Sequence, residues 1–249
     1  MTPVPTRGTR RIARLGNRLP KPLNHVAPVS HHEDPAVMRR RRRVVGVVTL
    51  IGAGALGVSL STRPGSRAFY TSTSVVAGVW TLGGLLSGPL HRGWVQSRDD
   101  RLHRPVVTPV VTGAAAFAVF YVGGQVARRI PPLRRAVSDV LAFAEEGDDG
   151  RVLLVTLANG VGEEIFFRGA LYTALGERHP ATISTLVYTL ATTTTRNPAL
   201  VLAAAVMGSL FGLQRRASQG VQAPLLTHLT WSSLMVRFLP PLFRRRPQA

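Results

Sequence analysis

Long apolar stretches separated by short basic or polar segments run through most of the chain. Residues 44–62, 68–90 and 105–127 each approach the ~20 residues that a helix needs to cross a bilayer. A short turn containing Pro64 and Gly65 joins the first two stretches, which favours a helical hairpin. The pattern therefore predicts three membrane-spanning helices in the first half of the chain.

The second half contains four more apolar stretches, at residues 151–175, 181–195, 198–213 and 221–236. Some are short for isolated spans, but they suit helices that pack around an internal cavity, where polar residues are less costly. Residues 137–143 are too short to cross a membrane, so we expect an interfacial helix and loop there, with a tilted short span as the alternative. The predicted fold is an all-α, polytopic transmembrane helical bundle of about seven or eight spans.

The charge distribution predicts a multi-pass protein of the cell membrane with its N-terminus in the cytoplasm. The formal charge is +19, and 45% of the residues are hydrophobic. Because the basic residues collect at the two ends and in loops between apolar stretches, the lipid bilayer is the expected partner and nucleic acid is not. The arginine run 39–43 precedes the first apolar stretch, and the basic segment 91–104 follows the second, as the positive-inside rule requires of cytoplasmic segments.

We expect one membrane domain between two basic tails. Its parts are a flexible basic cytoplasmic tail at 1–43, a transmembrane helical domain at 44–236 with a motif-bearing core at 151–236, and a basic C-terminal tail at 237–249. The arginines at 244–246 favour the cytoplasm and so an even number of spans, whereas seven stretches are clear. The chain has no cysteine, so any metal must be bound by His, Asp or Glu.

A cluster of charged residues interrupts the apolar stretch 151–175 near its middle. Glu163, Glu164 and Arg168 lie there, and each ionised group at the centre of a lone helix costs roughly 2.5 to 3.5 kcal/mol. Glu164 and Arg168 are four residues apart on one helix face, so they can form an ion pair. Glu163 points about 100° away and needs water, a metal, a proton or a donor from another helix. The cluster is either an ion network that holds the helices in register or a functional site.

One histidine can complete such a site. Of the seven histidines, only His228 lies inside an apolar stretch, and Ser232 follows it by four residues on the same helix face. A histidine can ligate a metal, hold a water molecule or donate a hydrogen bond. Together with Glu163 and Glu164, it can polarise a water molecule.

These residues resemble a known family. The sequence EEIFFRG from Glu163 to Gly169 matches the EExxxR signature of the CPBP intramembrane proteases, which include the type II CAAX prenyl endopeptidases and bacterial Abi-type proteins. FGLQR, which begins at Phe211, and HLTWS, which begins at His228, follow in the order and spacing of the family's FxxxH and HxxxN motifs. The resemblance covers residues 151–236.

The resemblance implies a role for each matched residue. Glu163 activates the attacking water with help from Glu164, and Arg168 orders the two glutamates. His228 binds the water or a metal, or stabilises the oxyanion. The chain departs from the pattern at Arg215, which replaces a histidine, and at Ser232, which replaces an asparagine.

The departures leave the cofactor open between zinc and no metal. Zinc would be held by Glu163, Glu164 and His228, because arginine has no lone pair for a metal. Arg215 can still stabilise an oxyanion, and Ser232 can donate a hydrogen bond in the place of asparagine.

The leading functional hypothesis is an intramembrane protease that hydrolyses a peptide bond in or near the bilayer with a glutamate-activated water. Its substrate is an unknown peptide or protein, and nothing in the sequence requires a prenylated one. The alternatives are a noncatalytic relative that serves as a membrane scaffold or partner-binding protein, and a proton-coupled transporter.

Overall fold

A computed structural model describes residues 26–28, 33–96, 101–177 and 179–243, and helices dominate this part of the chain. The long helices are α3 (Pro35–Ser59), α4 (Arg67–Ser87), α5 (Val107–Ala127), α6 (Pro131–Glu145), α7 (Asp149–Glu163), α9 (Pro180–Thr192), α10 (Pro198–Ser218) and α11 (Gln222–Phe238). The shorter elements are the π-helix η1 (Glu164–Leu171), α8 (Tyr172–Leu175), the 3₁₀-helix η2 (Thr193–Thr195), α12 (Pro240–Phe243), and the paired strands β1 (Val95–Gln96) and β2 (Leu102–His103).

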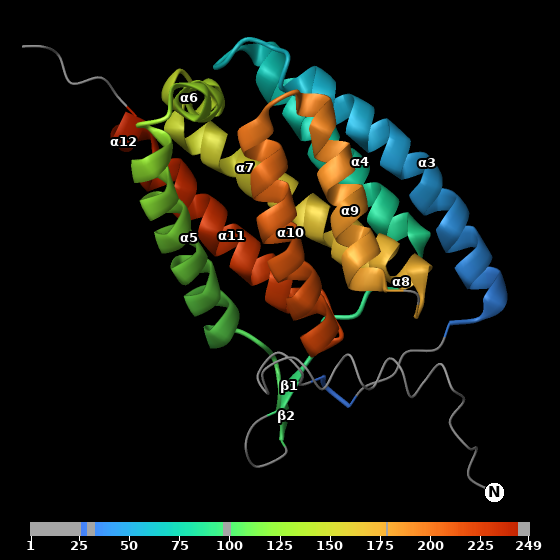
Figure 1. The fold of residues 1–249 in the computed structure, drawn as a ribbon. Helices are drawn as coiled ribbons and strands as arrows, with labels where there is room; N and C mark the ends of the chain where they lie inside the picture. Colours follow the sequence, from blue (N-terminus) through green and yellow to red (C-terminus); the bar gives the residue numbers. More distant parts are fainter. Residues whose placement is uncertain (1–25, 29–32, 97–100, 178, 244–249) are drawn as a thin grey trace, which may run out of the picture.

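The long helices lie side by side in one bundle, and α6 lies across one end of it (Figure 1). The beginning of α3 and the short helix α12 lie at opposite ends of this bundle (Figure 1). Among the described residues, α3, α5 and α10 are each long and apolar enough to cross a membrane. The predicted all-α membrane bundle is confirmed, whereas the number of spans stays a prediction.

The ends of the helices follow from local sequence. Asp34 precedes Pro35 and accepts a hydrogen bond from the Ala36 backbone at 2.7 Å, which satisfies one free N–H at the start of α3. Asn197 caps α10 in the same way, accepting from Ala199 at 2.9 Å. The helix that ends with α8 stops at Gly176, whose φ of +64° suits glycine.

The boundary of the N-terminal tail differs from the prediction. The sequence predicts a flexible tail that includes residues 35–43, but these residues form the first turns of α3, because the Asp34 cap and Pro35 start the helix ahead of the arginine run. Residues 1–25 and 29–32 of the predicted tail lie outside the described residues, as do residues 244–249 at the C-terminus.

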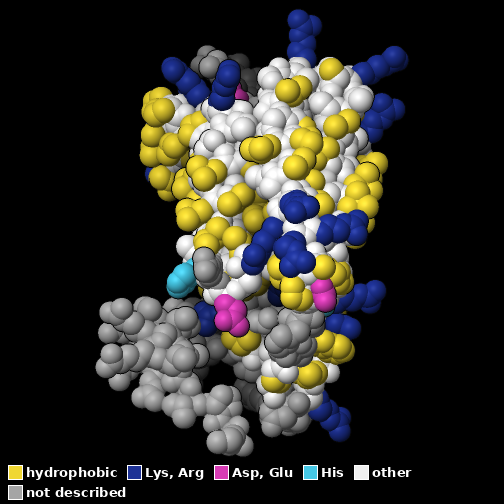
Figure 2. Space-filling view, turned by 90° about the vertical axis from the view of Figure 1, so that its right-hand side faces the viewer, with side chains coloured by type: hydrophobic (Ala, Val, Ile, Leu, Met, Phe, Trp, Pro, Cys, Tyr) yellow, Lys and Arg dark blue, Asp and Glu magenta, His cyan; other side chains and the backbone are white. Residues whose placement is uncertain are grey.

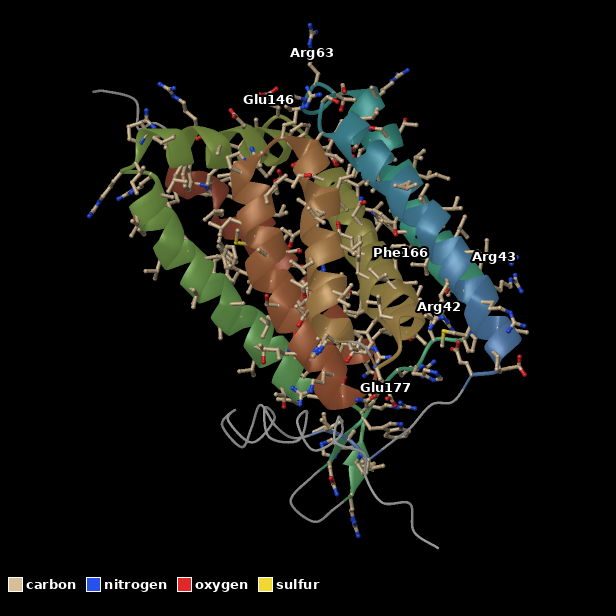
Figure 3. All side chains as sticks on the ribbon, turned by 45° about the vertical axis from the view of Figure 1, so that its right-hand side comes forward. Arg42, Arg43, Arg63, Glu146, Phe166 and Glu177 are labelled. Atoms are coloured by element: carbon tan, nitrogen blue, oxygen red, sulfur yellow. The ribbon has the colours of Figure 1, made fainter. Side chains whose placement is uncertain are left out.

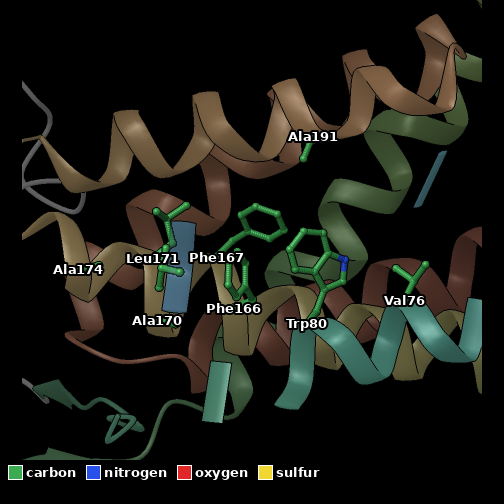
Figure 4. Packing of buried hydrophobic residues seen from close by; sticks show 9 residues of the cluster. Val76, Trp80, Phe166, Phe167, Ala170, Leu171, Ala174 and Ala191 are labelled. Carbon is green, nitrogen blue, oxygen red and sulfur yellow. The ribbon is translucent and has the colours of Figure 1, made fainter. Parts of the chain in front are cut away.

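A cluster of aromatic residues holds η1 against α3 and α4 (Figure 4). Trp80 of α4 is fully buried, and its ring lies 4.7 Å from that of Phe166 and 4.9 Å from that of Phe167, centre to centre. A side chain at Gly162 would lie 2.9 Å from the Ala77 carbonyl oxygen, so the close approach of α4 and α7 requires glycine there. In a membrane, close packing of this kind holds helices together, and it fixes the position of the charged residues next to Phe166.

Candidate active site

The site lies on one continuous helix, formed by α7, η1 and α8, that widens into a π-helix at Glu164–Leu171. Such widened turns are rare and are frequently found at functional sites. Side chains of two neighbouring helices bond to carbonyl groups within this turn: the Ser184 hydroxyl donates to the Phe167 carbonyl at 2.7 Å, and Arg215 Nε donates to the Arg168 carbonyl at 2.7 Å. The widened turn is therefore tied to α9 and α10.

Glu164 is the most tightly held of the predicted site residues. Its side chain is fully buried, and its Oε1 accepts from Arg168 Nη1 at 3.1 Å and lies 2.9 Å from His228 Nδ1. Its other oxygen, Oε2, is buried without a partner in the described part of the chain. The carboxylate thus joins the predicted ion pair with Arg168 to the histidine of α11.

Arg168 is also fully buried and is enclosed by the helices around it. Its Nη2 donates to the Gly208 carbonyl at 3.3 Å, and its guanidinium lies 4.6 Å from the centre of the Tyr188 ring and 5.0 Å from that of Phe211. A side chain at Gly208 would come within 3.2 Å of Nη2, so glycine leaves room for the guanidinium. The positive charge is stabilised by Glu164, a carbonyl dipole and two aromatic faces.

His228 is held by Glu164 on its edge and by Phe211 on its face. The Phe211 ring stacks on the imidazole with 4.7 Å between ring centres and 21° between planes. The other imidazole nitrogen, Nε2, faces α7, because a side chain at Gly160 would lie 3.6 Å from it. Phe211 begins the second motif, and the structure indicates that it orients the histidine of the third.

Glu163 is partly exposed, in contrast to its neighbour Glu164. Its Oε2 accepts a hydrogen bond from the Tyr188 hydroxyl at 2.6 Å. Glu163 follows Gly160 by one turn on the same face of α7 and lies within electrostatic range of His228. The Glu163 side chain and the Nε2 edge of the imidazole are therefore directed to the same side of the helix.

Tyr188 was not selected from the sequence. It lies in the apolar stretch 181–195. Its hydroxyl needs a hydrogen-bond partner when it is buried among apolar residues, and this need is the one sign in the sequence that Tyr188 belongs to a polar site. The partner, Glu163, is 25 residues away, so only the packing of α9 against the site helix reveals the pair.

Arg215 and Ser232 are placed differently from the four central residues. The Arg215 guanidinium lies 4.5 Å from the centre of the Tyr172 ring, and only 4% of the residue is exposed. Within the described chain it makes no hydrogen bond or ion pair with Glu163, Glu164 or His228, and its side chain contacts the backbone of the site helix instead. Ser232 is buried one turn after His228. Of the six residues proposed from sequence, the structure thus brings Glu163, Glu164, Arg168 and His228 together.

Comparison with known proteins identifies the segment that carries this cluster. Residues 150–234 match the family model described as type II CAAX prenyl endopeptidase Rce1-like. The chain contains an Rce1-like domain. No curated protein and no solved structure matches the chain.

The match confirms the resemblance seen in the three motifs and covers the helices that supply the site. An Rce1-like domain implies a CAAX-type intramembrane protease, and therefore a membrane-bound hydrolase. The matched segment begins at residue 150, so α3, α4, α5 and α6 lie outside it.

Two of the matched positions bear on whether this Rce1-like domain binds zinc. Among the described residues, no group of three His, Cys, Asp or Glu side chains is placed to hold a metal ion. His228 Nδ1 is bonded to Glu164, and Arg215, at the place of the second family histidine, cannot ligate a metal. A catalytic zinc ordinarily has three protein ligands, so zinc here would need Glu163, Glu164 and His228 together, and the choice between zinc and no metal stays a prediction.

Proposed function

We propose that the Rce1-like domain is an endopeptidase that hydrolyses a peptide bond in or beside the bilayer, with Glu163 as the general base toward water. The observation that carries this proposal is the difference between two adjacent glutamates. Glu164 is buried and bonded to Arg168 and His228, whereas Glu163 is partly exposed and, among the described residues, bonded only to the Tyr188 hydroxyl. The Glu164 carboxylate already binds Arg168 and His228, whereas the Glu163 carboxylate can accept a proton.

In the proposed reaction, the Glu163 carboxylate removes a proton from water while the water oxygen bonds to the peptide carbonyl carbon. The carbonyl π electrons move to its oxygen, and the His228 imidazolium donates from Nε2–H to the resulting oxyanion. Glu163 then returns the proton to the amide nitrogen as the C–N bond breaks. The products are a carboxylic acid, which loses its proton to water and becomes a carboxylate, and an amine.

The remaining residues act through the first two. In this reaction His228 is the doubly protonated imidazolium, whose Nδ1–H donates to Glu164 and whose Nε2–H is directed toward the Glu163 side of the helix. Arg168 balances the charge of Glu164, and the Tyr188 hydroxyl orients Glu163. Arg215 supports the main chain of the widened turn and does not contact the substrate.

Cleavage in isotopically labelled water tests the proposed reaction. We expect the purified chain in detergent to cleave a membrane peptide in H₂¹⁸O and to leave one ¹⁸O atom in the new carboxylate, because the water oxygen is the nucleophile. The rate should be unchanged by 1,10-phenanthroline, since no step requires a metal. Inhibition that zinc reverses would contradict the metal-free reaction, and failure to cleave any peptide of a broad panel would favour the noncatalytic scaffold.

We further propose that the chain crosses the membrane several times with its N-terminus in the cytoplasm, because the arginine run at the start of α3 obeys the positive-inside rule. Ser61 lies just beyond α3 and two residues before Arg63. Figure 3 shows Arg63 and Glu177 at opposite ends of the bundle, so Ser61 and Glu177 are then on opposite sides of the membrane.

Labelling of single cysteines tests this orientation, because the natural chain contains none. An impermeant maleimide added to intact cells should label Ser61→Cys, whereas Glu177→Cys should react only after the membrane is permeabilised. The reverse pattern would invert the orientation.

A further inference from the structure

A groove of about 880 Å³ lies on the outer face of the bundle between α3, α8 and α9. Its apolar walls are formed by Val45, Leu50, Leu171, Leu175, Ile183 and Val187. Gly46 and Ala174 also line it, and their small side chains leave the groove open. Its volume lies in the range that holds a small-molecule ligand.

One end of the groove carries a fixed positive charge. Arg42 lines the groove, and its Nε donates to the Ala174 carbonyl at 3.0 Å, which holds the guanidinium at this end. Arg42 is exposed, as are Arg39, Arg40 and Arg43 on the first turns of the same helix, whereas one acid, Glu177, lines the groove. In the space-filling view of this face, basic side chains gather below a region of exposed hydrophobic ones (Figure 2).

We propose that this groove binds one anionic phospholipid, with an acyl chain along the apolar walls and the phosphate at Arg42. The long apolar walls of the groove are complementary to an acyl chain. Without a specifically bound lipid, bulk lipid would fill the groove. The basic first turns of α3 lie where a transmembrane helix meets the headgroups, and basic residues at that depth attract anionic lipid. The excess of arginine over Glu177 selects a headgroup with net negative charge over a zwitterionic one.

The lipid would lie against the outer face of the helix that carries the candidate site. Leu171 and Ala174 line the groove, and they follow Arg168 on the same continuous helix. The Arg42 bond to the Ala174 carbonyl ties the headgroup end of the groove to the end of this helix. Lipid binding at this groove requires that α3 spans the membrane, as proposed above, and does not require proteolysis.

Two substitutions remove the two halves of the proposed site. A Cβ atom on Gly46 meets nothing within 4 Å, so Gly46→Leu can fill the groove without an internal clash. Gly54→Leu is its matched control, since Gly54 lies on the same helix, also meets nothing within 4 Å and does not line the groove. Arg42→Gln removes the charge, and its control is Arg63→Gln at the opposite end of the bundle (Figure 3).

Native mass spectrometry of the full chain in detergent measures the binding with three probes: dioleoyl phosphatidylglycerol, dioleoyl phosphatidylcholine and inorganic phosphate. We expect the wild type and both controls to retain one phosphatidylglycerol, Gly46→Leu to lose it, and Arg42→Gln to bind about fivefold more weakly, as expected for one basic residue near an anionic headgroup. Phosphatidylcholine should bind more weakly, and phosphate should not bind.

The proposal is overturned if Gly46→Leu retains phosphatidylglycerol as Gly54→Leu does, because the acyl chain would then lie elsewhere. It is also overturned if phosphatidylcholine binds as tightly as phosphatidylglycerol, or if Arg42→Gln and Arg63→Gln have equal effects. Binding of inorganic phosphate that Arg42→Gln abolishes would replace the lipid with a simple anion site.

Discussion

Replacement of Glu163 by alanine is expected to abolish peptide cleavage while the protein keeps its fold. A general base contributes about 10²- to 10⁴-fold to the rate, and no other carboxylate in the described cluster is accessible to replace it. The fold should survive because Glu163 makes its side-chain hydrogen bond to Tyr188 alone, and loss of one such partner costs about 1 to 3 kcal/mol. Cleavage rates and thermal unfolding in detergent measure the two effects on the same sample.

Tyr188→Phe is the matched control for this substitution. It removes the hydroxyl that orients Glu163 but keeps the ring that packs 4.8 Å from Phe167, centre to centre, and covers Arg168. We expect a smaller loss of rate than for Glu163→Ala, because the base is still present but less well oriented. Equal cleavage by wild type and Glu163→Ala would remove Glu163 from the mechanism.

Replacement of the adjacent Glu164 by alanine is expected to destabilise the whole protein. It leaves Arg168 fully buried without its counter-ion and His228 without the partner at Nδ1. Removal of one member of a buried ion pair costs about 3 to 5 kcal/mol, because the remaining charge is left uncompensated. The free energy of unfolding, or the melting temperature in detergent, should fall well below that of Glu163→Ala.

A double variant separates loss of the ion pair from loss of packing. Glu164→Met combined with Arg168→Met removes both charges and keeps side chains of similar length, and such replacements are often neutral or stabilising. We expect it to recover most of the stability lost in Glu164→Ala but none of the activity, since His228 remains without its carboxylate. If Glu164→Ala were as stable as Glu163→Ala, the ion network would not hold the bundle together.

Charge and spacing within one helix were sufficient to predict part of the site. Ionised groups in an apolar stretch are costly in free energy, so Glu163, Glu164 and Arg168 are expected to have partners. The spacing of four residues predicts that Glu164 and Arg168 form an ion pair. The observed ion pair agrees with that spacing. No charge or spacing in the sequence predicts the widened turn at Glu164–Leu171. Its carbonyl groups accept hydrogen bonds from Ser184 and Arg215, which lie on other helices.

The direction of a side chain in the interior was harder to predict. The family pattern predicts that Arg215, in the place of a family histidine, lies with the catalytic residues, yet its long side chain donates to the Arg168 carbonyl and covers the Tyr172 ring. Nothing near Tyr188 in the chain indicates that Glu163 is its partner, so spacing along the sequence does not predict this hydrogen bond.

By itself, the sequence determined the all-helical membrane class, the approximate extent of the long helices and which charged residues had to be compensated, because these depend on the length of apolar stretches and on spacing along one helix. The tertiary structure alone decided that Glu164 is buried in the ion network and that Glu163 is partly exposed. It also brought Tyr188 and Phe211 into the cluster, and it placed Arg215 against the backbone of the widened turn. Those outcomes depend on how α9, α10 and α11 pack around the widened turn, and contacts between residues far apart in the chain leave no periodic pattern in it.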